Sequence, residues 1–158
     1  MQDISLRKSM ISDAEQLHEL QIEAFSELLE KYRDYDTSPA AEKLERTIMR
    51  LKRAGSDYYF IRFAEESIGA IRIVRNDEIY ELKQLYIIPA YQGRGFAQKT
   101  IKLMEAFYPE AVCWELETIK QEARLCHLYE KMGYVQTGKE EVINDKMTLV
   151  FYRKQGVR

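Results

Sequence analysis

The sequence predicts a mixed α/β fold, an α+β arrangement with a twisted, mostly antiparallel sheet of about seven strands and about four helices. Segments rich in β-branched and aromatic residues alternate along the chain with segments that have helical spacing. Three β-rich segments between residues 58 and 88 follow one another with short turns, which is typical of an antiparallel meander. The strand at 79–88, the helix after it and the next strand predict a parallel unit with a right-handed crossover.

The individual elements follow from local signals. Ser12 and Glu15 have the spacing of a capping box and predict the start of an amphipathic helix. Ser38 as N-cap and Pro39 at the first helical position predict a second helix. Strands are predicted at 4–8, 58–64, 68–74, 79–88, 112–117, 134–142 and 146–152, and helices at 12–31, 38–55, 96–108 and 123–131.

Length and composition indicate one globular domain, and we expect it to span residues 1–158. The chain is 46% apolar and 32% charged, and its formal net charge is −2. This balance gives no reason to expect nucleic acid or an anionic membrane as a partner. No apolar run approaches the roughly 20 residues that cross a bilayer, and Met1–Ile4 does not have the features of a signal peptide, so we expect a cytoplasmic protein.

The cysteines and histidines predict neither a disulfide nor a metal site. Cys113 and Cys126 lack the spacing of metal ligands, and we expect both to be small, mostly buried apolar side chains. His18 and His127 have no cysteine or aspartate cluster beside them, so no zinc site is expected.

The segment at 79–107 has the most specific pattern in the chain. Its β-rich run ends at Pro89, Gly93 and Gly95 follow, and a helix begins near Phe96. The first N–H groups of a helix are unpaired and carry the positive end of its dipole, and glycines let an anion approach them closely. The segment therefore predicts a phosphate site, with an ordinary strand-turn-helix corner as the alternative.

Two familiar phosphate loops are excluded by the residues present. A Walker loop needs a Gly-Lys-Ser/Thr sequence that the chain lacks, and a dinucleotide loop needs a third glycine where Gln98 stands. Gln92, Arg94 and Lys99 could add side-chain donors to an anion held by the backbone.

What remains is the pattern Gln92-x-x-Gly95-x-Ala97, which resembles the acetyl-CoA pyrophosphate loop of the GCN5-related N-acetyltransferase (GNAT) superfamily. The segment Leu128–Tyr134, Leu-Tyr-Glu-Lys-Met-Gly-Tyr, is similar to a second motif of that superfamily. The predicted order of strands and helices also agrees, so the resemblance covers nearly the whole chain. It implies a sheet splayed between the fourth and fifth strands and acetyl-CoA as the cofactor.

The resemblance also implies where the cofactor is held. Its diphosphate would lie on the N–H groups of the glycine loop, and its pantetheine arm would pair with the fourth strand like an added strand. Core packing is the alternative role for the strand residues, and both roles can hold because the contacts use backbone. Many relatives carry an asparagine after the fifth strand, where this chain has Gln121 and Glu122, and either could replace it. The implied cofactor-binding residues are Leu85, Tyr86, Ile87, Gln92, Gly93, Arg94, Gly95, Phe96, Ala97, Gln121 and Tyr129.

The family transfers acetyl directly to an amine, without a covalent enzyme intermediate. The resemblance makes Tyr129 the general acid that protonates the leaving thiolate, with a core-packing tyrosine as the alternative. It makes the N–H of Ile87 or of a neighbour the donor to the thioester oxygen. A carboxylate would take the proton of the ammonium, and we expect Glu81 in this role. The other candidates are Glu78, Glu115 and Glu117, each with a solvated surface role as the alternative.

The acceptor is expected to be a primary amine of a small molecule. The resemblance places the acceptor cleft around the first two helices and the final hairpin, and Glu27, Tyr32 and Tyr35 are the expected substrate residues. Acidic and aromatic groups together suit a cation, although an ordinary solvated loop would have the same composition. A protein or peptide N-acetyltransferase and a non-catalytic acyl-CoA-binding module are the alternatives. The exposed edge of the final hairpin also predicts a possible homodimer.

Overall fold

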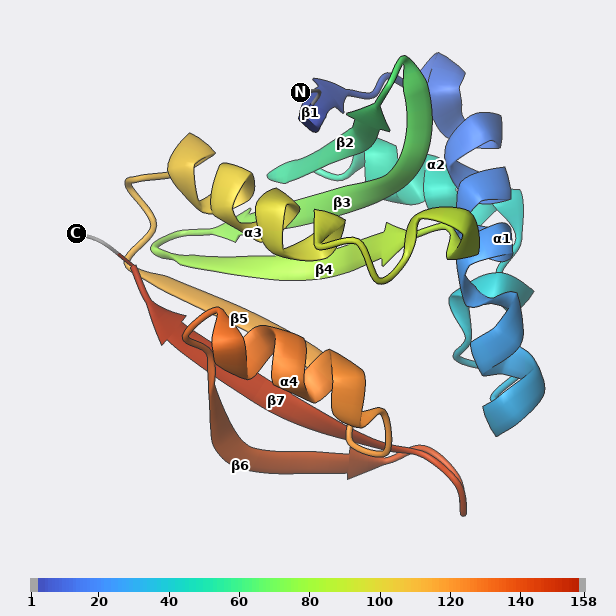
Figure 1. Ribbon diagram of the computed structural model, residues 1–158, viewed down its shortest axis with the longest axis vertical. Coiled ribbons are helices and arrows are strands. Elements are labelled where there is room, and N and C mark those ends of the chain that lie inside the picture. The colour runs from blue at the N-terminus through green and yellow to red at the C-terminus, as the bar shows by residue number, and fades with distance from the viewer. Residues whose placement is uncertain (1–2, 157–158) are drawn as a thin grey trace.

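The computed structural model describes residues 3–156 as one seven-stranded sheet with helices on both faces (Figure 1). The strand order is β1-β2-β3-β4-β5-β7-β6, and all neighbours are antiparallel except the parallel pair β4–β5. This arrangement confirms the predicted fold class. The elements are β1 Ser5–Lys8, η1 Ile11–Asp13, α1 Ala14–Tyr32, η2 Pro39–Ala41, α2 Leu44–Lys52, β2 Ser56–Phe63, β3 Glu66–Asn76, β4 Ile79–Ile87, η3 Pro89–Tyr91, α3 Phe96–Phe107, β5 Cys113–Ile119, α4 Ala123–Lys131, β6 Val135–Val142 and β7 Thr148–Gln155.

Two apolar clusters, one on each face of the sheet, hold the layers together. The larger joins α3 and α4 to the sheet, with Ile101, Met104 and Tyr129 packed in one cluster with Ile71 and Trp114. The smaller packs Leu17 of α1 with Tyr58, Phe60, Ala70 and Tyr86 on the opposite face. Burying side chains of this size contributes about 1.5–3 kcal/mol each. The sheet therefore carries the α1–α2 layer on one face and the α3–α4 layer on the other.

The sheet is divided where β4 meets β5. These strands pair only from Ile79 to Glu81 on β4 and from Cys113 to Glu115 on β5. Beyond Glu81 the strands diverge, and Figure 1 shows β4 turning toward α1 while β5 follows β7. The predicted splay between the fourth and fifth strands is thus present, and it leaves the last six residues of β4 without a strand partner on the β5 side.

Two local predictions were wrong. The capping box of Ser12 and Glu15 does not form, because the chain first makes the 3-10 turn η1, where the Asp13 carboxylate accepts the N–H of Met10 at 2.8 Å. For the second helix, Ser38 is an N-cap with Pro39 after it, as predicted, but it caps only the short turn η2; the predicted continuous helix is interrupted, and α2 begins after an extended Glu42 and Lys43.

Other expectations can be compared directly with the structure. Cys113 is buried as expected, whereas Cys126 is only half-buried. Gly133 ends α4 in the left-handed conformation, with φ of 94°, as the sequence predicts. No helix among residues 3–156 combines the length and apolar character needed to cross a membrane.

Candidate active site

The free edge of β4 provides backbone groups for a ligand. The N–H of Ile88 donates to the carbonyl of Ile68 on β3 at 2.9 Å, which fixes the alternation of the antiparallel ladder. Tyr86, two residues before Ile88, directs its backbone N–H and C=O groups to β3 as well. The backbone groups of Leu85 and Ile87 alternate with these and therefore point away from β3, toward the side where β5 diverges. We call this divergence, where residues 82–87 of β4 have no strand partner on the β5 side, the slot. Its β4 side offers the pairing pattern that an extended amide-containing chain needs.

A glycine loop lies at the open end of the slot. Gly93 and Gly95 have φ of 76° and 81°, and a Cβ atom added to either would meet no atom within 4 Å. Gly95 is the N-cap of α3, whose first turn has no acidic residue and no side-chain cap. The first N–H groups of this 12-residue helix thus have no side-chain cap and carry the positive end of its dipole. This geometry fits a diphosphate, and the slot beside it fits the amide-bearing arm of acetyl-CoA.

Gln92 spans the start of the slot instead of extending freely into solvent. Its Nε2 donates to the Ile87 carbonyl at 2.7 Å, and its Oε1 accepts from Arg124 of α4 at 3.3 Å. The two halves of the sheet are therefore linked by side chains at the point where the phosphate loop begins. Arg124, which sequence reasoning missed, brings a cation to this loop from the second half of the sheet.

Arg94 is held on the outer side of the loop. Its guanidinium lies 5.2–5.5 Å from the ring centroids of Phe63, Tyr91 and Phe96. Phe96 itself is buried in the core, so its side chain is not available to a ligand. Phe96 and Ala97 can serve an anion through their N–H groups at the start of α3.

Tyr129 occupies the face of α4 that packs on the sheet. Its ring is buried, with centroids 6.1 Å from Tyr134 and 6.3 Å from Tyr152. Its hydroxyl has no hydrogen-bond partner among the side chains of residues 3–156. Burial raises the pKa of Tyr129 well above its usual value, so the hydroxyl holds its proton at neutral pH. A neutral, unpaired phenol is the state that a proton donor needs.

The carboxylates proposed as bases gather where β4 and β5 separate. Glu81 is the last paired residue of β4, it lies opposite Glu115, and its carboxylate is 3.3 Å from the Lys83 ammonium. Glu115 is paired with Arg153, whose Nε lies 3.0 Å away. Glu117 is exposed two residues further along β5, and Glu78 lies in the exposed β3–β4 turn. Of this group, Glu81 and Glu115 hold the last paired position before the strands diverge.

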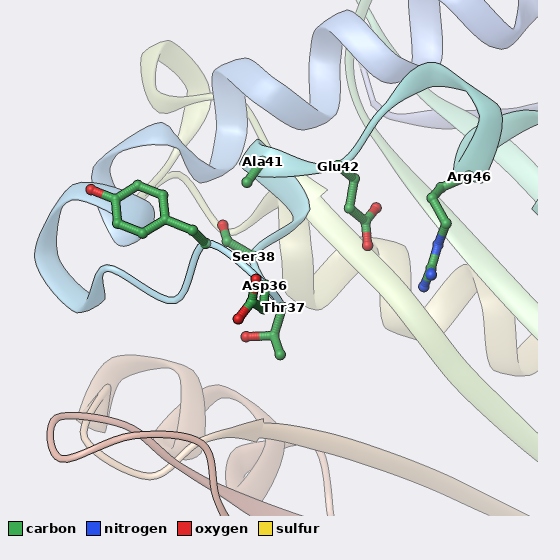
Figure 2. A pocket seen from close by; sticks show the side chains of 7 residues that line it. Asp36, Thr37, Ser38, Ala41, Glu42 and Arg46 are labelled. Atoms are coloured by element: carbon green, nitrogen blue, oxygen red, sulfur yellow. The ribbon is translucent and has the colours of Figure 1, made fainter.

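The expected acceptor residues do not form one cluster. Tyr35 is exposed and lines a cavity of about 350 Å³ between the α1–α2 loop and the start of α2. Figure 2 shows Glu42 and Arg46 extending in the same direction at this cavity, with Asp36 and Thr37 beside them. Glu27 lies on the exposed face of α1 and does not line the cavity. Tyr32 is buried, and its hydroxyl donates to Glu122 at the start of α4.

Glu42, which lines the cavity, belongs to an ion pair with Arg50. Both Glu42 oxygens accept from Arg50 of α2, at 2.6 and 2.8 Å. Gln21 of α1, which is fully buried, donates to the same carboxylate at 2.8 Å and to the Pro39 carbonyl at 2.8 Å. Although burial raises the pKa of Glu42, the hydrogen bond and charge of Arg50 outweigh it, and the pKa is lowered overall. Glu42 is therefore a fixed anion at the cavity wall.

Two more predicted cofactor residues have other partners. Gln121 is exposed, and its Oε1 accepts the N–H of Thr148 at 3.0 Å, which ties the β5–α4 loop to the start of β7. The Tyr86 side chain lies under α1, where its hydroxyl donates to the Leu17 carbonyl at 3.1 Å. The sequence predicts Glu122 only as a possible replacement for the family asparagine, and not as the partner of Tyr32. Its position just before α4 is the one feature of the sequence that marks it.

Comparison with known proteins identifies the fold and the family. The profile of the acetyltransferase (GNAT) family matches residues 14–134, which is most of the chain. The chain belongs to the acetyltransferase (GNAT) family. As a member of this family, it is an N-acetyltransferase, and acetyl-CoA is its acetyl donor. The glycine loop and the slot described above are the parts of the GNAT fold that fit this cofactor.

Solved structures with low sequence identity share the GNAT fold. A spermidine N-acetyltransferase from Vibrio cholerae, in complex with CoA and spermine, superimposes with a TM-score of 0.76 at 18% identity, covering 96% of this chain and 95% of that one. An acetyltransferase from Thermus thermophilus gives 0.75 at 15% identity, covering 96% of both chains. RimL, a ribosomal L7/L12 alpha-N-protein acetyltransferase in complex with CoA, gives 0.75 at 12% identity, covering 97% and 94%. A search of curated proteins finds no match.

Proposed function

We propose that this GNAT protein acetylates a primary amine of a small molecule by direct attack in a ternary complex of protein, acetyl-CoA and amine. The observation that carries the proposal is the free β4 edge that runs into the glycine loop at the start of α3. When bound, acetyl-CoA supplies an acetyl group activated as a thioester.

The residues of the chain have separate roles in this proposal. The first N–H groups of α3 bind the diphosphate, and the backbone groups of Leu85 and Ile87 orient the pantetheine arm. The Ile87 carbonyl is held by Gln92, so this hydrogen bond exchanges when the arm is seated. The N–H of Ile87 points into the slot and can stabilise negative charge on an oxygen there; one such donor typically contributes about 3 kcal/mol in a transition state.

Two groups move protons. Burial raises the pKa of Tyr129, so its hydroxyl keeps its proton at neutral pH and would be the donor to a leaving thiolate. Glu81, at the closed end of the slot, accepts the proton of the incoming ammonium directly or through water. Glu115 is less suited to this task because two nitrogens of Arg153 donate to one of its oxygens, whereas Glu81 has a single, longer ion pair with Lys83 at 3.3 Å.

The cavity beside α2 favours a small acceptor over a protein. Its volume of about 350 Å³ is within the range of small-molecule sites, which is about 300–1,000 Å³. Its wall holds the exposed Tyr35 ring, whose face attracts cations. The Glu42 carboxylate at the same wall is paired with Arg50, and Arg46 also lines the cavity. A protein acceptor is the second candidate, because the structurally similar RimL is an acetyltransferase of a ribosomal protein.

The test is acetyl-CoA consumption, followed as release of free thiol, with polyamines, aminoglycosides, amino acids and short peptides as acceptors. We expect turnover with one class of small amine and a reduced rate for Tyr129→Phe. Turnover with peptides alone would favour the second candidate. Binding of CoA without turnover of any amine would instead indicate a non-catalytic acyl-CoA-binding module.

We also propose that two copies associate through β6. This strand is the edge of the sheet, and all eight of its residues are exposed, including Val135 and Val142. An exposed edge strand offers unpaired backbone groups to a second strand. Light scattering during size-exclusion chromatography should give twice the chain mass, and a monomer at every concentration would contradict the proposal.

A further inference from the structure

The end of α1 meets the start of α4 at a carboxylate that already holds a primary ammonium. The Nζ of Lys31 lies 2.5 Å from Oε2 of Glu122. The hydroxyl of Tyr32 donates to the same oxygen. The Glu122 side chain is only 18% exposed, whereas the Lys31 side chain is 58% exposed. The Glu122 carboxylate is thus held in place, and the Lys31 ammonium bound to it lies on an exposed side chain that another ammonium ion can displace.

An aromatic ring completes this site. The Lys31 ammonium is 5.1 Å from the centroid of the Tyr32 ring, within the range of a cation–π contact. Tyr32 is buried, and its carbonyl accepts from Nδ2 of Asn144 at 3.1 Å, so the β6–β7 turn holds it from the other side. Glu122 is the N-cap residue of α4, yet its side chain makes no cap hydrogen bond and turns to α1 instead. The side chains of Glu122 and Tyr32 together form a receptor for an alkyl ammonium ion, and the Lys31 ammonium occupies it.

The receptor lies next to the proposed active site. Glu122 and Tyr129 are seven residues apart, which places them on one face of α4 and about 10 Å apart along its axis. Tyr32 ends α1 directly before the loop that lines the cavity in Figure 2. A molecule of a few carbon atoms can therefore span from Glu122 to a group reacting in the slot.

The ammonium on Glu122 is not the group that reacts. Burial raises the pKa of Glu122, but the hydrogen bonds from Lys31 and Tyr32 outweigh burial and lower it overall. The carboxylate is therefore ionised at neutral pH, and an ammonium paired with it is stabilised in its protonated form. A protonated amine has no lone pair for attack, so the acceptor needs another amino group.

We propose that the acceptor is a diamine or polyamine, and that one of its ammonium groups replaces the Lys31 ammonium on Glu122 and Tyr32 while another amino group is acetylated. This inference rests on the proposed function, because it assigns the acceptor class of the same active site. It makes Glu122 and Tyr32 specificity-determining residues and gives Lys31 the role of an internal competitor.

The experiment compares diaminobutane with butylamine, which has the same carbon chain but one amino group. The wild-type protein should acetylate diaminobutane with a kcat/KM at least about tenfold higher, the effect of one hydrogen-bonded charge pair. Glu122→Gln should raise the KM for diaminobutane by about tenfold and leave the KM for butylamine unchanged. Lys31→Gln should lower the KM for diaminobutane by about two- to fivefold, because the competing ammonium is gone.

Lys120→Gln is the matched control, since it breaks an exposed pair with Glu140 at 3.1 Å on the far side of the same loop. It should change neither KM. The comparison of the two amines needs no variant, so a Glu122 variant that fails to fold does not remove the test. A wild-type protein that acetylates both amines equally overturns this inference and leaves the proposed function standing. A wild-type protein that acetylates no amine overturns both.

Discussion

Glu42→Gln should destabilise the α1–α2 layer by a measurable amount, because one carboxylate joins three elements there. In the wild type, Arg50 donates to both oxygens of Glu42, and Gln21 donates to one of them. The Glu42 and Arg50 side chains are only 15% and 13% exposed. Glutamine keeps one acceptor oxygen but presents an NH₂ group to the second Arg50 nitrogen, so one charge-assisted hydrogen bond is lost and the remaining one weakens.

The size of the effect follows from these contacts. A charge-assisted hydrogen bond contributes about 1.5–3 kcal/mol, and a cation left unpaired in a buried site costs about 3–5 kcal/mol. Arg50 would also be left close to Arg72, whose pKa is lowered to about 10 by burial first and by the charge of Arg50 second. Because the pair is not fully buried, we expect the free energy of unfolding to fall by about 2–4 kcal/mol.

Urea unfolding followed by circular dichroism measures this loss. Glu140→Gln, which breaks the exposed pair with Lys120, is the control and should cost no more than about 1 kcal/mol. Replacing Arg50 by methionine in the Glu42→Gln background should recover part of the stability, because the unpaired cation is removed. A Glu42→Gln protein within about 0.5 kcal/mol of wild type would refute the argument that this pair holds the layer.

Three further predictions concern other parts of the molecule. Tyr129→Phe keeps the ring packing and removes only the hydroxyl, so steady-state kinetics should show kcat lower by about 100-fold with little change in KM; an unchanged kcat would exclude the acid role. Gly69→Ala would place a Cβ atom 2.0 Å from the Tyr86 carbonyl oxygen, so thermal unfolding should show a loss of about 2 kcal/mol or more, and an unchanged melting temperature would contradict the close approach of β3 and β4. Burial raises the pKa of Asp57, but hydrogen bonds from Tyr108, Arg75 and Lys8 lower it overall. Its stabilising effect is therefore present above about pH 4 and is lost as the pH falls through the lower folded-state value; Asp57→Asn should flatten the acid side of a stability curve, and an unaltered curve would rule this out.

The sequence was sufficient for the fold because its signals are local or periodic. The alternation of strands and helices predicted every major element, and Pro89 with Gly93 and Gly95 marked the turn from β4 to α3. The interruption of the second helix was not predicted, since it depends on Gln21 and Arg50 holding Glu42 in an extended conformation. Such a conformation is set by tertiary partners, which propensity does not include.

The site was predicted less completely because its partners are distant in the chain. Gln92 was expected to contact a ligand, but its side chain binds the Ile87 carbonyl and Arg124. Lys31 and Glu122 are 91 positions apart, and only the meeting of α1 with α4 brings them together. Sequence spacing showed which residues could bind an anion or a cation. The structure showed which of these residues, such as Gln92 and Glu122, already bind other side chains or backbone groups of the chain.

The most direct test of direct acetyl transfer uses acetyl-CoA labelled in its acetyl group and follows the label by mass spectrometry. The protein should stay unlabelled when mixed with labelled acetyl-CoA alone. Addition of an accepted amine should then give the labelled N-acetyl amine and free CoA in equal amounts. A labelled protein that forms before the amine is added and passes its label to the amine would contradict the account, as would the absence of any N-acetyl product.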